Sequence, residues 1–270
     1  MNRCVHWNRR RGLHPISGFV CRAPERAGLA VRAPGSPALS AIAALTAQNT
    51  RGVIAVHVPP LEFLQAQLDA CFDDFDIHAV KLGMLANADV IHLVADVLET
   101  HRPPQVVLDP VMVATSGARL LEASALRALR ERLLPLATLL TPNTPEAELL
   151  LGRRIGNAAE AEDAAAALLG LGAGAVLLKG GHLDEGPRVI DRYFDGVTGE
   201  EFSHARLPVE AHGTGCTLAA AIAAQLCRGL SLPNACGAAI DYVARGLRNG
   251  YQPGRGEVMV LDHFGAAGPA

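Results

Sequence analysis

Short apolar runs alternate with longer amphipathic segments along the chain from about residue 38. The runs over 79–84, 106–110 and 175–179 have the length and the branched side chains of buried strands. The segments between such runs carry apolar residues at helical spacing, and they predict helices over 60–72, 87–98, 123–134, 145–151, 158–170 and 233–248. This alternation predicts an α/β fold, a mostly parallel central sheet with helices on both faces (an α/β/α sandwich).

Weaker patterns add further elements at the edges of this sheet. Residues 188–204 are typical of a β-hairpin around Asp195-Gly196. Strands are also predicted over 53–58, 136–140 and 258–261. The sequence from residue 39 onward holds no internal repeat and no long linker, so we expect residues 39–270 to form one domain.

Polar residues collect where the predicted strands end. Met84, Asp109, Asn143 and Lys179 each close or follow an apolar run, and the segment 212–216 leads into a helix. In sheets of this kind, ligands bind outside the carboxyl ends of the strands. We therefore expect these positions to meet at one edge of the sheet and to form the functional site there.

The most informative junction is the segment 211–217, AHGTGCT, which runs directly into an alanine-rich helix. Backbone N–H groups at a helix start lack intrahelical partners, and together with the positive end of the helix dipole they bind anions. The same field is expected to lower the pKa of Cys216 toward the thiolate. One turn would then hold a phosphate and supply a base. The alternative is an ordinary loop-to-helix junction with an inert cysteine.

Composition narrows the class of protein. Half of the 270 residues are hydrophobic and the net charge is only −3, which gives no reason to expect a nucleic-acid partner. No apolar run reaches the length of a membrane span, so no membrane partner is expected. The six cysteines show no paired spacing, which argues against disulfides or structural zinc and fits a reducing cytoplasm.

An anion site, a candidate base, a lysine and acidic groups suit phosphoryl transfer, which depends on positioning and on neutralising charge. Asn143 and Glu146, three positions apart at a helix start, would associate with a hydrated Mg²⁺ rather than enclose it in a protein cage. The alternative for this pair is a helix cap followed by a solvated glutamate. Neither a Walker A motif nor a protein-kinase glycine loop is present in the sequence.

Six segments together carry a resemblance to a known family: ALTAQNTRGV (44–53), VKLGML (80–85), VVLDPVMVATSGARLL (106–121), LLTPNTPEAELLLG (139–152), VLLKGGHL (176–183) and HGTGCTLAAAIAA (212–224). In this order they resemble the hydroxymethylpyrimidine/phosphomethylpyrimidine kinases of thiamine biosynthesis, in the ribokinase superfamily. The resemblance implies ATP-dependent phosphorylation of 4-amino-5-hydroxymethyl-2-methylpyrimidine and then of its monophosphate, with ATP and Mg²⁺ as cofactors. It also implies a cytoplasmic homo-oligomer.

Position by position, the resemblance assigns the phosphate-transfer turn. Cys216 matches the catalytic base, and the backbone of Gly213, Thr214 and Gly215 matches the anion hole. Gln48 matches the residue that hydrogen-bonds the aminopyrimidine edge, which suits an amide because it offers both a donor and an acceptor. Its alternative role is to stabilise a turn.

The remaining matches concern the pyrimidine wall and the charged groups. Met84 matches an apolar wall of the pyrimidine site, although its spacing alone predicts a core residue. Asn143 and Glu146 match the Mg²⁺-associated pair, and Lys179 matches a lysine near the nucleotide phosphates, with a solvated lysine as the alternative. Asp109 would serve metal or phosphate charge, or would only order the end of its strand.

Residues 1–38 depart from the family pattern. They contain Trp7 and the run Arg9-Arg10-Arg11 without any periodicity, which predicts an irregular leader. The glycine-rich turn that supplies part of the family's pyrimidine site has no counterpart there. We interpret this leader as a divergent or damaged N-terminus, such as a frame-shifted translation would give. A pyridoxal-type kinase on the same fold and an inactive remnant without the substrate loop remain open as alternatives.

Overall fold

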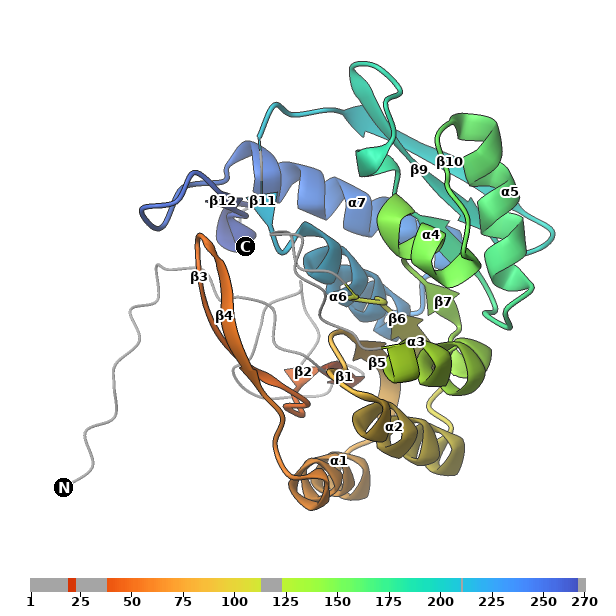
Figure 1. Cartoon of the computed structure of the whole chain (residues 1–270), viewed down its shortest axis with the longest axis vertical. Helices are drawn as coiled ribbons and strands as arrows, with labels where there is room; N and C mark the ends of the chain where they lie inside the picture. Colours follow the sequence, from red (N-terminus) through yellow and green to blue (C-terminus); the bar gives the residue numbers. More distant parts are fainter. Residues whose placement is uncertain (1–18, 23–37, 113–122, 210, 267–270) are drawn as a thin grey trace.

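The computed structural model describes residues 19–22, 38–112, 123–209 and 211–266, and its centre is an eight-stranded sheet (Figure 1). The strand order is β10-β9-β8-β7-β6-β5-β1-β2. The bounds of these strands are β1 Phe19–Arg22, β2 Ala38–Leu39, β5 Ile77–Leu82, β6 Gln105–Leu108, β7 Leu139–Leu140, β8 Val176–Leu178, β9 Arg188–Phe194 and β10 Gly199–Ala205.

The middle of the sheet is parallel and both flanks are antiparallel. Strands β5, β6, β7 and β8 pair in parallel, in registers such as Leu82 with Leu108 and Leu108 with Leu140. Strands β9 and β10 form the predicted hairpin, and β9 runs antiparallel to β8. The predicted α/β fold is therefore confirmed, as a mixed sheet that is parallel where the site residues lie.

The leader contributes one described strand. Where the sequence predicts an irregular segment, Phe19–Arg22 forms β1, which pairs antiparallel with β5 on one side and with β2 on the other. The other predictions for residues 1–18 and 23–37 lie outside the described residues.

Helices cover both faces of the sheet (Figure 1). Alternate residues of each buried strand point to opposite faces, so Val107 and Leu177 pack with α6 and α7, whereas Leu108 and Leu178 pack in a core with α1, α2, α4 and α5. The bounds of the helices are α1 Leu61–Asp74, α2 Ala88–His101, α3 Ala123–Ala128, α4 Thr144–Leu151, α5 Ala158–Leu169, α6 Thr214–Cys227, α7 Leu232–Arg248 and α8 His263–Ala266.

Two small ribbons lie outside the central sheet. Strands β3 (Leu45–Asn49) and β4 (Gly52–His57) form an antiparallel hairpin, so the predicted strand at 53–58 pairs with its own neighbour and not with the main sheet. Strands β11 (Ala211–His212) and β12 (Met259–Val260) pair in parallel just before α6. The predicted last strand at 258–261 thus supports the start of α6.

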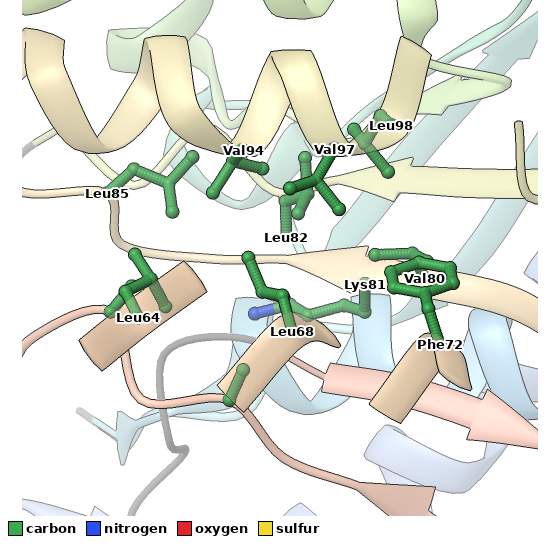
Figure 2. Close-up of a pocket in the computed structure, with 12 residues that line it drawn as sticks. Leu64, Leu68, Phe72, Val80, Lys81, Leu82, Leu85, Val94, Val97 and Leu98 are labelled. Atoms are coloured by element: carbon green, nitrogen blue, oxygen red, sulfur yellow. The ribbon is translucent and has the colours of Figure 1, made fainter. Parts of the chain in front are cut away.

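A small cavity of about 30 Å³ lies between β5, α1 and α2 (Figure 2). Its lining residues are apolar except for Lys81, and Figure 2 shows this side chain on the side of β5 opposite to Leu82 and Val97. A ligand pocket for a heterocycle is roughly ten times larger or more, about 300 Å³ at least. We therefore regard this cavity as a packing void and not as a substrate site.

In the described part of the chain, no helix combines the length and the apolar character that a membrane span requires.

Candidate active site

The start of α6 offers a set of backbone donors. Gly213, the residue before the helix, has a left-handed conformation with φ 78° that favours glycine. The first helical hydrogen bond of this turn runs from Thr217 N–H to Gly213 O, at 2.9 Å. The N–H groups of residues 214–216 come before it and have no carbonyl of the helix to bind. This turn therefore has the local geometry of an anion site, as expected from the sequence.

Asp109 lies at the centre of the charged groups. It follows β6, and its side chain is 2% exposed. Its Oδ1 atom accepts a hydrogen bond from Lys179 Nζ at 3.2 Å, and its Oδ2 atom lies 3.6 Å from Lys81 Nζ. Burial opposes ionisation of this carboxyl group, but the two ammonium groups outweigh it and hold the pKa of Asp109 below its usual value.

Lys179 connects this carboxylate to the start of α6. A Cβ atom added to Gly215 would lie 2.9 Å from Lys179 Nζ, so the ammonium group stands directly against the helix backbone. Lys179 also lies 3.7 Å from Glu146 Oε2. Burial disfavours its charge, yet Asp109 and Glu146 raise its pKa above the usual value. The sequence left open a solvated lysine at this position, but the structure encloses it between two carboxylates.

Cys216 corrects one expectation. The helix N-terminus was expected to lower the pKa of this thiol, whereas burial raises it to about 12. Lys81 and Lys179 lower the pKa only in part, because the neighbouring Asp109 carboxylate raises it again. In this structure, Cys216 is therefore a protonated thiol within the charged cluster.

Asn143 and Glu146 form a reciprocal helix cap at the start of α4. Glu146 N–H donates to Asn143 Oδ1 at 2.9 Å, and Asn143 N–H donates to Glu146 Oε2 at 2.7 Å. The capping alternative is thus realised, but the glutamate is buried and not solvated. Burial raises the pKa of Glu146 to about 7, with Lys179 lowering it and Asp109 raising it.

Lys81 is the residue of this cluster that the sequence analysis missed. It lies in β5, inside the quoted segment 80–85, and its side chain is 1% exposed. The available signal was a lysine within the apolar run 79–84, since a buried lysine requires a charged partner. Its partner, Asp109, ends the adjacent strand β6.

The two predicted pyrimidine contacts come from β3 and from the residue pair that follows β5. Met84 is buried just after β5, which agrees with both a core position and an apolar wall. Gln48 is exposed in β3, on the peripheral hairpin. Among the described residues, no hydrogen bond or ion pair joins Gln48 to Asp109, Lys179 or Glu146.

A sheet with a parallel centre, a helix start that offers backbone N–H donors and a buried lysine–carboxylate cluster at its carboxyl edge fit a ribokinase-like phosphotransferase. A family model described as phosphomethylpyrimidine kinase matches residues 29–261. The chain belongs to this family. The match begins inside the segment 1–38 that the sequence analysis set apart as a leader.

Individual relatives agree with this assignment. The hydroxymethylpyrimidine/phosphomethylpyrimidine kinase of Rhizobium meliloti is 49% identical over 206 residues, which cover 76% of this chain and 77% of that protein. A thiamine biosynthesis bifunctional protein of Geobacter sulfurreducens is 47% identical over 234 residues. These residues span 86% of this chain but only 47% of that relative's length.

Solved structures share the fold. The phosphomethylpyrimidine kinase of Clostridium difficile superposes with a TM-score of 0.70 at 34% identity, over 77% of this chain and 86% of that one. The pyridoxal kinase of Staphylococcus aureus, solved with AMP-PCP and pyridoxal, gives a TM-score of 0.75 at 30% identity, over 83% of this chain and 81% of that one. Fold likeness alone therefore does not separate the two kinds of kinase.

Proposed function

We propose that this chain transfers the γ-phosphoryl group of ATP to the hydroxymethyl group of 4-amino-5-hydroxymethyl-2-methylpyrimidine, and then phosphorylates the monophosphate, in thiamine biosynthesis. The observation that carries the proposal is the cluster of Asp109, Glu146, Lys179 and Cys216 at the start of α6, in a chain of the phosphomethylpyrimidine kinase family. We also keep the cytoplasmic homo-oligomer as a prediction from the family.

In the proposed reaction, the backbone N–H groups of 214–216 and the Lys179 ammonium group hold the migrating phosphoryl group and offset its charge. Lys179 suits this role because it already stands against the helix start and keeps its charge there. Binding of this kind suits phosphoryl transfer, in which positioning and charge stabilisation supply most of the catalysis.

Cys216 takes the proton of the attacking hydroxyl group in this proposal. Because burial raises its pKa to about 12, the thiol first releases its proton to solvent, and the thiolate then accepts the proton of the substrate hydroxyl group; Lys81 and Lys179 favour the thiolate because they lower this pKa. The substrate oxygen thereby gains the electron pair of its O–H bond and forms the new bond to phosphorus, while ADP leaves.

Asn143 and Glu146 fit a hydrated Mg²⁺ near the nucleotide. Glu146 is a buried carboxylate whose pKa of about 7 reflects its poor solvation, and a nearby dication would offset that penalty. When bound, Mg²⁺ would neutralise charge on the ATP phosphates. The capping bonds fix the orientation of both side chains before any ion arrives.

A pyridoxal-type kinase is the second candidate, and the likeness to the Staphylococcus aureus enzyme favours it. Release of ADP should be followed with the hydroxymethylpyrimidine, its monophosphate and pyridoxal as separate substrates. We expect kcat/KM for the two pyrimidines to exceed that for pyridoxal. A higher value for pyridoxal would replace the proposed substrate, and a folded protein that turns over none of the three would support the inactive remnant.

A further inference from the structure

The tip of the β3–β4 hairpin contacts a glycine-rich loop near the other end of the chain. Gly256 N–H donates a hydrogen bond to Thr50 Oγ1 at 3.1 Å, across 206 positions of sequence. Figure 1 shows the tip of the hairpin beside the segment that leads into β12. Since a two-stranded ribbon has little stability of its own, a contact at its tip matters for its position.

The backbone of this loop lies so close to Thr50 that only glycine fits at two of its positions. A Cβ atom added to Gly254 would lie 2.7 Å from Thr50 Oγ1 and 2.8 Å from its Cγ2 atom. A Cβ atom added to Gly256 would lie 2.6 Å from the Thr50 carbonyl oxygen. Neither glycine has a positive φ, so the reason for glycine here is space and not backbone conformation.

Backbone hydrogen bonds hold the loop between Tyr251 and Val260 beside the turn at Gly213. Tyr251 and Val260 exchange both backbone hydrogen bonds, at 3.1 and 2.9 Å, and Gln252 Nε2 donates to Glu257 O at 2.7 Å. Val260 pairs in β12 with His212 of β11, and the next residue is Gly213. The hairpin tip is thus connected, through one short loop, to the start of α6.

We propose that Thr50, Gly254 and Gly256 form a latch that positions the β3–β4 hairpin, and with it Gln48, relative to the anion-binding turn. This inference rests on the proposed function, because it takes Gln48 as a contact for the pyrimidine. Thr50 is then a positioning residue: it holds the alcohol substrate's side of the site in register with the phosphate's side, without touching either substrate.

The direct test compares Thr50→Val with Thr50→Ser. Valine keeps the shape of the threonine side chain but lacks the hydroxyl oxygen that accepts the hydrogen bond from Gly256 N–H. Serine keeps this hydroxyl group. We expect Thr50→Val to raise the KM for the hydroxymethylpyrimidine roughly 3- to 10-fold, the range of one lost hydrogen bond, with little change in kcat, in the KM for ATP or in the melting temperature. Thr50→Ser should restore the KM to within about 2-fold of wild type.

Removal of the steric contact gives an independent test. Gly254→Ala should weaken pyrimidine binding because of the clash with the Thr50 side chain, and the double variant with Thr50→Ala should be no worse than Thr50→Ala alone. Gly256→Ala should not be rescued in this way, since its clash is with the Thr50 backbone. Additive losses for Gly254→Ala and Thr50→Ala would contradict the latch.

Amide hydrogen exchange separates failure of the latch from failure of the proposed function. We expect faster exchange of residues 45–57 in Thr50→Val and Gly256→Ala than in the wild type and in Thr50→Ser. Should the wild type phosphorylate none of the tested alcohols, the proposed function falls while this exchange pattern still supports the latch. Unchanged exchange in both variants overturns the latch, whatever the kinetics.

Discussion

At the scale of single residues, Asp109 is the carboxylate that neutralises both lysines of the site. Its two oxygens face Lys179 and Lys81, and all three side chains are largely or fully buried. A buried ion pair is destabilising to break because the remaining charge has lost both its partner and its water. Asp109 therefore supports the structure of the site as well as its proposed chemistry.

We expect Asp109→Asn to lower the free energy of unfolding by about 3–5 kcal/mol, since it leaves the buried Lys81 ammonium group without a carboxylate and removes one of the two carboxylates beside Lys179. Equilibrium unfolding in urea measures this loss. Asp96→Asn is a matched control, because Asp96 pairs with Arg132 on the surface and its side chain is 67% exposed. That change should alter stability by less than about 1 kcal/mol. Equal losses in the two variants would contradict the central role of Asp109.

Cys216→Ala tests the proposed path of the proton. Removal of the proton acceptor should lower kcat roughly 100- to 10,000-fold and change the KM values much less. Steady-state kinetics with both substrates varied gives the separation. Cys71→Ala is the control, because Cys71 lies in α1 outside the cluster and should leave kcat near the wild-type value. A Cys216→Ala variant that loses only binding would remove the sulfur from this role.

Glu146 makes stability depend on pH in a defined direction. Its folded pKa of about 7 lies above the usual value of 4.5, so between these values the folded state holds a proton that the unfolded chain has released. Stability from this group therefore falls as pH rises through that window. We expect Glu146→Gln to gain stability relative to the wild type on going from pH 5 to pH 8. Thermal melting at both pH values measures the difference, and a constant or reversed difference would contradict the burial of the charge.

At the scale of elements, the turn after β8 is held by the antiparallel flank of the sheet. Gly180 packs its backbone on the backbone of Ile190 in β9, without room for a Cβ atom. The buried carboxylate of Asp191 accepts from Gly180 N–H at 2.9 Å, and Arg206 donates to Gly181 O at 2.8 Å. These contacts fix the turn that follows Lys179.

Adjacent glycines in this turn provide a matched pair of variants. Gly180→Ala should destabilise the fold by about 3 kcal/mol or more, because the new methyl group meets backbone that cannot move aside. Gly181→Ala meets no atom within 4 Å and should change stability by less than about 1 kcal/mol. Urea unfolding of both variants checks this contrast. A Gly180→Ala variant as stable as Gly181→Ala would show that the turn is not held as described.

The periodic elements were accessible from the sequence because each buries one face. Helices α2 and α5 begin after the asparagines that cap them, and α6 begins at the predicted turn. The hairpin β3–β4 was less accessible, since it leaves the central sheet and exposes apolar residues such as Ile54. A pattern that depends on burial gives little information about a ribbon that is barely buried.

At the scale of the whole molecule, the site could be predicted in part. Asp109 and Lys179 were placed together because parallel strands bring their carboxyl ends to one edge. Lys81 and the raised pKa of Cys216 were not predicted, since both depend on which side chains are enclosed together after folding. The contact between Thr50 and Gly256 was likewise not predicted, since it joins residues 206 positions apart in the sequence.

Two observations concern the N-terminal part of the molecule: Phe19–Arg22 forms strand β1 in the central sheet, and the family match begins at residue 29. Strand β1 occupies the position next to β5 in antiparallel orientation and completes that side of the sheet together with β2.

The most direct measurement is the mass of the pyrimidine after incubation with the wild-type chain, ATP and Mg²⁺. We predict formation of the phosphorylated pyrimidine, followed by the doubly phosphorylated product, and loss of both in Cys216→Ala. An unchanged pyrimidine, in the presence of a folded chain that binds ATP, would contradict the account.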